Sequence, residues 1–190
     1  VSPQRREELR LPSGRGGVVV ASVVGLAGLE QLVHGDVVLE LNRQPIPNLA
    51  AYRKAVAALH SGDVADGELL ARLAESVPVH AVLGNNDVSP RDQLPERLEL
   101  TFGDHQLAMV HDSGARTGRE QRMRRWFPQA DVVIFGHSHR PLDVRTPSGQ
   151  RLFNPGSATQ RRQAPTTTYG WITVGPDGLT TRVLDTTLRP

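Results

Sequence analysis

Residues 131–139 decide the fold, and their sequence is Asp131-Val132-Val133-Ile134-Phe135-Gly136-His137-Ser138-His139. The run 132–135 is β-branched or aromatic and a glycine ends it, which predicts a strand buried on both faces and a tight turn. Two histidines, separated by one residue, then follow the carboxyl end of this strand, where open α/β sheets place their sites. At that spacing each imidazole can reach a different one of two neighbouring metal ions.

Composition narrows the classes of protein that fit. The chain has 190 residues, 38% of them hydrophobic, which suits one large domain or two small ones. Cysteine is absent, so any metal site must use His, Asp, Glu or Asn rather than a thiolate. Arginines cluster at 119–125 and 161–162, but the net charge is only +2 and aromatic residues make up only 4%. We therefore expect no dedicated nucleic-acid binder.

The sequence also bears on location. No apolar run approaches the roughly 20 residues that span a bilayer. Residues 1–10 are polar and charged, unlike a signal peptide. We therefore expect no membrane segment and a cytoplasmic protein.

Apolar runs and turn residues predict alternating strands and helices. Helices are expected at residues 26–33, from the cap at Asn48 to about Leu59, at 67–75, and around Met123, Trp126 and Phe127. Strands are expected at residues 18–24, 37–41, 79–83, 98–102, 106–110, 132–135, 151–153, 168–174 and 179–184. The strands at 98–110 and at 168–184 are expected to form hairpins.

The first third of the chain, residues 5–58, resembles the PDZ domains of bacterial HtrA-type proteases. The resemblance is carried by the runs LPSGRGGVVV at 11–20, AGL at 27–29 and GDVVLELNRQP at 35–45. It implies that backbone N–H groups of Gly16 and Gly17 bind the carboxyl terminus of a peptide, which pairs with the strand at Val18. The last strand of a PDZ domain is missing, so the segment is a partial one.

Four polar signatures follow short apolar strands in the rest of the chain: Gly62-Asp63, then Gly84-Asn85-Asn86-Asp87, then His111, then Gly136-His137-Ser138-His139. In this order they resemble the calcineurin-like metallophosphoesterases, most closely their small bacterial and archaeal phosphodiesterase branch. The resemblance implies an α/β fold, a two-sheet sandwich flanked by helices. We expect a partial PDZ-like segment at 1–58 and an N-terminally truncated phosphoesterase domain at 59–190.

The resemblance assigns metal ligands. Asp63 would bridge two divalent metals, His139 would bind the first, and three residues would complete the second: Asn85, His111 and His137. Oxygen and imidazole ligands suit Mn²⁺, Fe, Zn²⁺ or Ni²⁺, and Mn²⁺ is the expected ion. Two such metals activate a water and hold the phosphate oxygens for in-line attack, so the expected reaction is hydrolysis of a small phosphodiester.

The signature at 84–87 also carries two expected catalytic roles. Asn86 stands where many members of the family have a histidine that protonates the leaving group. Because an amide cannot donate that proton, substrates with good leaving groups are expected. Asp87 is expected to orient a neighbouring ligand. Asn154 and Ser157 are expected to make a turn near the site, with contact to the substrate as the alternative. Surface or structural roles are expected for His34, His60, His80 and His105.

One part of the family pattern is missing. The family begins with a strand that ends in Asp-x-His and holds the first metal, and this sequence contains no Asp-x-His. The PDZ-like segment stands in its place. Alternatively, residues 18–24 fill the slot of that strand, although Ala21, Ser22 and Val23 hold a divalent metal poorly. The sequence therefore predicts one firm metal site and one weakened site, with a correspondingly low rate.

A second hypothesis is a non-catalytic scaffold. A retromer subunit that resembles this branch uses the same fold as a binding surface, and the missing motif favours such a role. The partner would be a protein surface or the carboxyl terminus of a peptide. The incomplete sheet at the join near Leu59 predicts strain, a molten patch or dimerisation there, so a homo-oligomer is one expected outcome.

Overall fold

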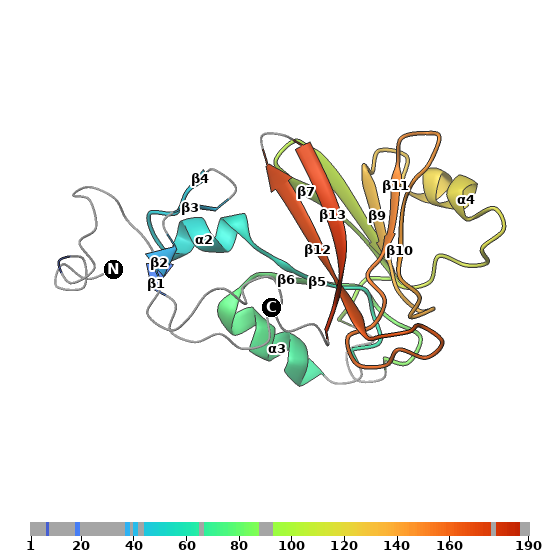
Figure 1. Cartoon of the computed structure of the whole chain (residues 1–190), viewed down its shortest axis with the longest axis horizontal. Helices are drawn as coiled ribbons and strands as arrows, with labels where there is room; N and C mark the ends of the chain where they lie inside the picture. The colour runs from blue at the N-terminus through green and yellow to red at the C-terminus, as the bar shows by residue number, and fades with distance from the viewer. Residues whose placement is uncertain are drawn as a thin grey trace.

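The computed structural model describes residues 44–64, 67–87, 93–175 and 178–186, together with residues 7, 18–19, 37–38 and 40–41. Figure 1 shows the main sheet toward one end of the molecule with helix α4 (Arg119–Trp126) on its outer side. Helices α2 (Leu49–Ala55) and α3 (Gly67–Ser76) lie toward the other end. None of the helices in the described part of the chain is long and apolar enough to cross a membrane.

The main sheet has five strands in the order β10-β11-β9-β8-β7. Their bounds are Arg97–Phe102 for β7, His105–Val110 for β8, Val132–Phe135 for β9, Leu142–Arg145 for β10 and Arg151–Asn154 for β11. The three inner strands run parallel to one another, and each edge strand is antiparallel to its inner neighbour. The predicted hairpin of β7 and β8 and the predicted strand β9 are confirmed.

The core lies on both faces of this sheet because successive side chains of a strand point to opposite sides. On one face, Val133 and Phe135 of β9 belong to an apolar cluster with Met123 and Phe127 of the α4 region. On the other face, Val132 and Ile134 belong to a cluster that packs against two further strands, β12 (Thr168–Gly175) and β13 (Gly178–Asp185). Strands β12 and β13 pair as the predicted terminal hairpin. The architecture is α/β with mixed sheets, as expected.

A second, smaller sheet carries the other side of the site. Strand β5 (Ala58–His60) is parallel to β6 (Val79–Ala81), and α3 connects them. The helix predicted from Asn48 to Leu59 does begin at that cap, because Asn48 Oδ1 accepts a hydrogen bond from Ala51 N at 2.9 Å. The predicted end is wrong, since α2 stops at Ala55 and Val56 is extended at φ −130° and ψ 148°. Pairing with β6 outweighs the helical preference of the residues that follow.

Little of the first third is described. Two short antiparallel pairs are present, β1 (Val18–Val19) with β2 (Val37–Val38), and β3 (Glu40–Leu41) with β4 (Gln44–Pro45). The predicted helix at 26–33 lies outside the described residues, as do Gly16, Gly17, residues 21–23 and His34. Among the residues that are described, nothing supports the PDZ-like resemblance.

Candidate metal centre

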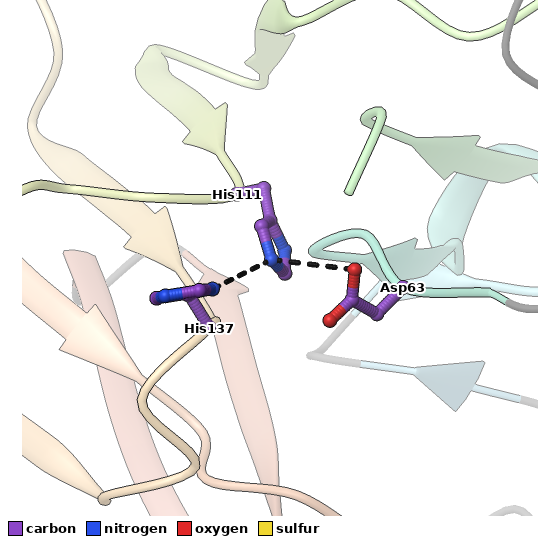
Figure 2. A group of neighbouring side chains, drawn as sticks. All are labelled: Asp63, His111 and His137. Carbon is purple, nitrogen blue, oxygen red and sulfur yellow. Dashed lines mark hydrogen bonds and ion pairs between the residues drawn. The ribbon is translucent and has the colours of Figure 1, made fainter. Parts of the chain in front are cut away.

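Four loops meet at one point, and each follows the carboxyl end of a parallel strand. Asp63 follows β5, Asn85 follows β6, His111 follows β8 and His137 follows β9. Figure 2 shows the side chains of Asp63, His111 and His137 turned toward one another, and their ligand atoms all lie within 4.8 Å of one another. Strands β8 and β9 end directly before His111 and Gly136, whereas one or two residues separate β5 and β6 from their signatures.

The donor atoms are spaced as ligands of one ion. Asn85 Oδ1 lies 2.9 Å from His111 Nε2 and 2.8 Å from His137 Nδ1. His111 Nε2 lies 3.2 Å from His137 Nδ1 and 3.4 Å from Asp63 Oδ1. Ligand atoms about 2.1 Å from a cation lie about 3.0–3.4 Å from one another in tetrahedral or octahedral geometry. The distances of 2.8–3.4 Å between these donors are close to that spacing, so the group could surround a single divalent cation.

The tautomer of His111 also suits metal binding. Its Nδ1 lies 2.6 Å from the carbonyl oxygen of Ser61, which can only accept, so Nδ1 carries the hydrogen and donates it. The lone pair is then on Nε2, the atom that faces Asp63, Asn85 and His137. His111 is only 5% exposed, so this orientation is fixed by packing as well as by the hydrogen bond.

The carboxylate of Asp63 is held ionised by its neighbours. Asn86 donates to both of its oxygens, from the backbone N to Oδ1 at 2.9 Å and from Nδ2 to Oδ2 at 2.8 Å. Burial raises the pKa of Asp63, but the hydrogen bonds from Asn86 and the nearby His111 and His137 outweigh burial and hold that pKa below its ordinary value. An ionised carboxylate beside two imidazoles is a hard anionic donor suited to a divalent cation.

Asp87 and two glycines bring the β5 and β6 loops together. Asp87 is 2% exposed, and its Oδ2 accepts hydrogen bonds from Gly84 N at 2.7 Å and from Asp63 N at 3.2 Å. A Cβ on Gly84 would lie 2.0 Å from Asp63 N, and a Cβ on Gly62 would lie 2.6 Å from His111 Nδ1. The loops can approach this closely only because both positions are glycine.

Backbone strain is concentrated at the same place. Among the described residues, those other than glycine with a left-handed φ are Asp63 at 57°, His137 at 59°, His139 at 55° and Arg162 at 47°. Three of these four are predicted metal ligands. Such conformations cost free energy and persist where the surrounding structure fixes them.

Asn154 helps to fix the turn that carries His137. Its side chain is fully buried, and Nδ2 donates to the carbonyl oxygen of Gly136 at 2.9 Å and to Ser138 Oγ at 3.1 Å. Its Oδ1 accepts from the backbone N of Gly156 at 2.9 Å. The turn expected at residues 154–157 thus holds the His-x-His turn through hydrogen bonds.

The structure brings most of the predicted site residues together. Asp63, Asn85, His111 and His137 surround one point, and Asn86 and Asp87 bind the backbone or carboxylate of Asp63.

His139 is not part of the cluster within the described residues. Its Nδ1 donates to the carbonyl oxygen of Gln160 at 2.6 Å. The ligand role predicted for His139, and the catalytic roles predicted for Asn86 and Asp87, stay predictions. Val18 lies in β1, away from these loops in sequence.

Three histidines expected to be structural lie in strands. His105 Nδ1 is 3.4 Å from Asp131 Oδ2, and the ring of His80 meets Phe102 edge-on at 6.3 Å between centroids. His60 is half-buried, and its Nδ1 has no hydrogen-bond partner among the described residues. Burial lowers the pKa of His60, so the neutral imidazole is favoured.

Comparison with known proteins establishes the family. The chain matches the calcineurin-like phosphoesterase superfamily domain over residues 33–177, and it belongs to this superfamily. The match begins within the segment 1–58 that resembles a PDZ domain, so the predicted domain boundary after residue 58 stays a prediction. Members of the superfamily use divalent metals, in agreement with the donor set described above.

Individual relatives are similar to this chain over part of their length. A probable metallophosphoesterase from Methanothermobacter thermautotrophicus is 31% identical over 114 residues, covering 59% of this chain and 66% of that protein. The chain thus spans just under two thirds of that relative. The probable metallophosphoesterase YsnB from Bacillus subtilis is 30% identical over 132 residues, covering 67% of this chain and 73% of YsnB.

A solved structure shows the same fold. Wild-type Vps29 from Entamoeba histolytica, complexed with zinc, superposes with a TM-score of 0.54 and 19% identity. The superposition covers 68% of this chain and 81% of that one. At this identity the likeness concerns the fold alone.

Proposed function

We propose that this protein is a metal-dependent phosphodiesterase that hydrolyses small phosphodiesters with good leaving groups. The observation that carries the proposal is the convergence of Asp63, Asn85, His111 and His137 on a point that fits one divalent cation. Membership of the calcineurin-like superfamily and the names of the relatives support phosphoester hydrolysis. The restriction to diesters is our inference from the resemblance to the small phosphodiesterase branch of the family.

Each residue has a separate task in this proposal. A bound divalent cation would supply Lewis acidity and a water of lowered pKa. Asp63 and Asn85 offer oxygen donors, while His111 and His137 offer imidazole nitrogens. Asn86 donates hydrogen bonds to both oxygens of Asp63, and its amide is not acidic enough to protonate a leaving group. The leaving group must therefore depart as a stable anion, which favours activated aryl phosphodiesters.

The proposal also specifies the number of metal ions. His139 and Asp63 alone would hold a second ion weakly, because the sequence has no Asp-x-His to complete its ligands. Elemental analysis of protein purified without chelator should then give close to one equivalent, lost on His111→Ala. We expect Mn²⁺, with Fe, Zn²⁺ or Ni²⁺ as substitutes of the same ligand preference. Two equivalents would mean that another residue completes the second site.

The activity is tested with bis(4-nitrophenyl) phosphate and added Mn²⁺. The variant Asp63→Asn keeps the shape of the side chain but removes its charge, and it should lower the rate by at least about a hundredfold. The matched control is Asp104→Asn, in the exposed turn between β7 and β8 at the other end of the sheet from His111. No hydrolysis by folded wild-type protein with Mn²⁺, Fe²⁺, Zn²⁺ or Ni²⁺ would overturn the proposal.

The alternative function is a non-catalytic scaffold, favoured by the missing Asp-x-His and by the fold shared with Vps29. It predicts metal binding without hydrolysis, and capture of a protein partner. The peptide version assigns binding to Gly16, Gly17 and Val18, and a pull-down unchanged by Gly17→Ala would count against it. Assembly into a homo-oligomer and a cytoplasmic location remain predictions, which size-exclusion chromatography and cell fractionation would test.

A further inference from the structure

The turn that carries His137 and His139 is held by a second loop, residues 157–163. Contacts run in both directions between them. His139 Nδ1 donates to the carbonyl oxygen of Gln160 at 2.6 Å, and Arg162 Nη1 donates to the carbonyl oxygen of His137 at 3.1 Å. Arg140 Nη2 donates to Gln163 Oε1 as a third link. Each segment therefore holds the backbone of the other through a side chain.

Both segments are strained where they touch. His137, His139 and Arg162 all have a left-handed φ, of 59°, 55° and 47°. Without other contacts an L-residue would leave this conformation, so neighbouring groups must hold it in place. The loop itself is anchored at its start, because Ser157 Oγ accepts from Gln160 N at 3.1 Å and the Ser157 carbonyl accepts from Thr168 N of β12 at 2.9 Å.

The contact of Arg162 acts directly on a metal ligand. The carbonyl it binds belongs to His137, whose Nδ1 lies 2.8 Å from Asn85 Oδ1 and 3.2 Å from His111 Nε2. Fixing that carbonyl fixes the peptide plane after His137, and so limits rotation of the backbone that aims the imidazole at the cluster. Arg162 is exposed, so burial alone does not explain why it keeps a strained conformation.

We propose that Arg162 is a positioning residue for the metal centre, which holds the His137 imidazole on the point where Asn85 and His111 converge. This inference rests on the metal site of the proposed function. A simple electrostatic argument predicts the opposite effect of Arg162, because the positive guanidinium repels a nearby divalent cation. If charge dominated, removing Arg162 would tighten metal binding. Positioning predicts the reverse, so the sign of the change decides between the two.

The experiment titrates the metal-free wild-type protein and three variants with Mn²⁺ and measures the Kd by calorimetry. Arg162→Ala should raise the Kd about tenfold, as expected when a group that orients a ligand is lost. Arg162→Lys keeps the charge and one donor at a time, and it should restore part of the affinity. Arg161→Ala is the matched control, because Arg161 is also exposed and its Nη1 donates to the carbonyl oxygen of Pro165 rather than to the turn of His137. It should leave the Kd within about twofold of wild type.

The outcomes separate this inference from the proposed function. Wild-type protein that binds no Mn²⁺, Zn²⁺ or Ni²⁺ would overturn the proposed function and the inference with it. Wild-type protein that binds Mn²⁺, with an unchanged or lower Kd for Arg162→Ala, would overturn the inference alone. A purely structural role would lower the thermal stability of the metal-free variant without changing its Kd, so both quantities are measured. Equal losses of affinity in Arg161→Ala and Arg162→Ala would also overturn it.

Discussion

The two halves of the candidate metal centre are held in place by different forces. His111 and His137 follow β8 and β9, which are neighbours in the five-stranded sheet, and every residue of β9 is buried. Asp63 and Asn85 follow β5 and β6, strands of three residues that pair with each other and are mostly half-buried. We call these the sheet half and the loop half of the site.

The difference between the two halves shows how the short β5–β6 sheet can position candidate ligands without a large apolar core. The sheet half relies on apolar packing, which is strong but not directional. The loop half has less apolar packing and relies instead on directional contacts, namely the carboxylate of Asp87 and the close approach permitted at Gly62 and Gly84. Stability should therefore depend mostly on the sheet half, whereas metal affinity should be most sensitive to the loop half.

The largest effect on stability is expected for Met109→Ala in the sheet half. Met109 is fully buried in β8, two residues before His111, so truncation leaves a cavity. The free energy of unfolding should fall by about 2–5 kcal/mol, measured by urea denaturation of metal-free protein. The affinity for Mn²⁺ should change less than about twofold. Val144→Ala, on the exposed face of edge strand β10, is the control with little effect. A parallel loss of affinity in Met109→Ala would show that the halves are not separable.

The next effect is expected for Gly84→Ala in the loop half. The new Cβ would lie 2.0 Å from Asp63 N and 2.3 Å from Asp63 Oδ1, so the loops must separate. Overpacking of this kind should cost about 1–3 kcal/mol of stability. The Kd for Mn²⁺ should rise about a hundredfold, because Asp63 moves away from His111. In Gly67→Ala the Cβ meets nothing within 4 Å, so this control should leave affinity unchanged. Equal Kd values for the two variants would contradict the dependence of the loop half on the close approach at Gly84.

Much of the fold could be predicted because apolar runs, alternating patterns and turn residues mark its strands. The run 132–135 forms a strand with the predicted bounds, and both hairpins lie where alternation and turns placed them. Strand β10 was missed, since Leu142-Asp143-Val144-Arg145 has two charged residues beside a proline and becomes a strand by pairing with β11. The end of α2 was misplaced for the same reason, because the pairing of Ala58–His60 with β6 is a tertiary contact.

The candidate site divides in a similar way. Polar side chains at strand ends could be found because they follow apolar runs, and the resemblance to the family implied that four of them converge. The groups that hold them could not be found. Ser61 and Gln160 act through backbone carbonyl oxygens, which every residue possesses. Arg162 acts across 25 positions of sequence, and nothing in its neighbours distinguishes it from Arg161.

A smaller effect is expected for Asp87→Asn. The amide keeps an oxygen that can accept from Gly84 N and Asp63 N, but it loses the charge that strengthens both bonds. The free energy of unfolding should fall by about 1–2 kcal/mol. The Kd for Mn²⁺ should rise about tenfold. The control is Asp131→Asn, whose Oδ2 accepts from Gln106 N at 2.9 Å before the start of β9, at the other end of that strand from His137. An equal rise in Kd for the control would attribute the change to net charge rather than to position.

The smallest effect should come from Asp143, which joins β10 to β11 and to the terminal hairpin. Its Oδ1 accepts from Arg151 Nε at 2.5 Å, and its Oδ2 accepts from Thr181 Oγ1 at 2.7 Å. Burial raises the pKa of Asp143, but the bonds from Arg151 and Thr181 and the charge of Arg151 outweigh burial and hold that pKa below its ordinary value of 3.8. The carboxylate is thus favoured in the folded state.

The direction of the pH dependence follows from that lowered pKa. A group whose pKa is lower when folded adds stability above its ordinary value, and this stability is lost as the pH falls through the folded pKa. The difference in unfolding free energy between wild type and Asp143→Asn should be about 1 kcal/mol at neutral pH and should shrink below about pH 4. Urea denaturation at several pH values measures it, and a difference that stays constant down to about pH 3 would rule out a contribution from the carboxylate charge. Because the carboxylate of Asp143 bonds to Arg151 and Thr181 and to none of the four candidate ligands, its loss should leave Mn²⁺ affinity at neutral pH unchanged. A change in affinity would show that the terminal hairpin and the candidate metal centre are coupled, and that stability and affinity cannot be separated.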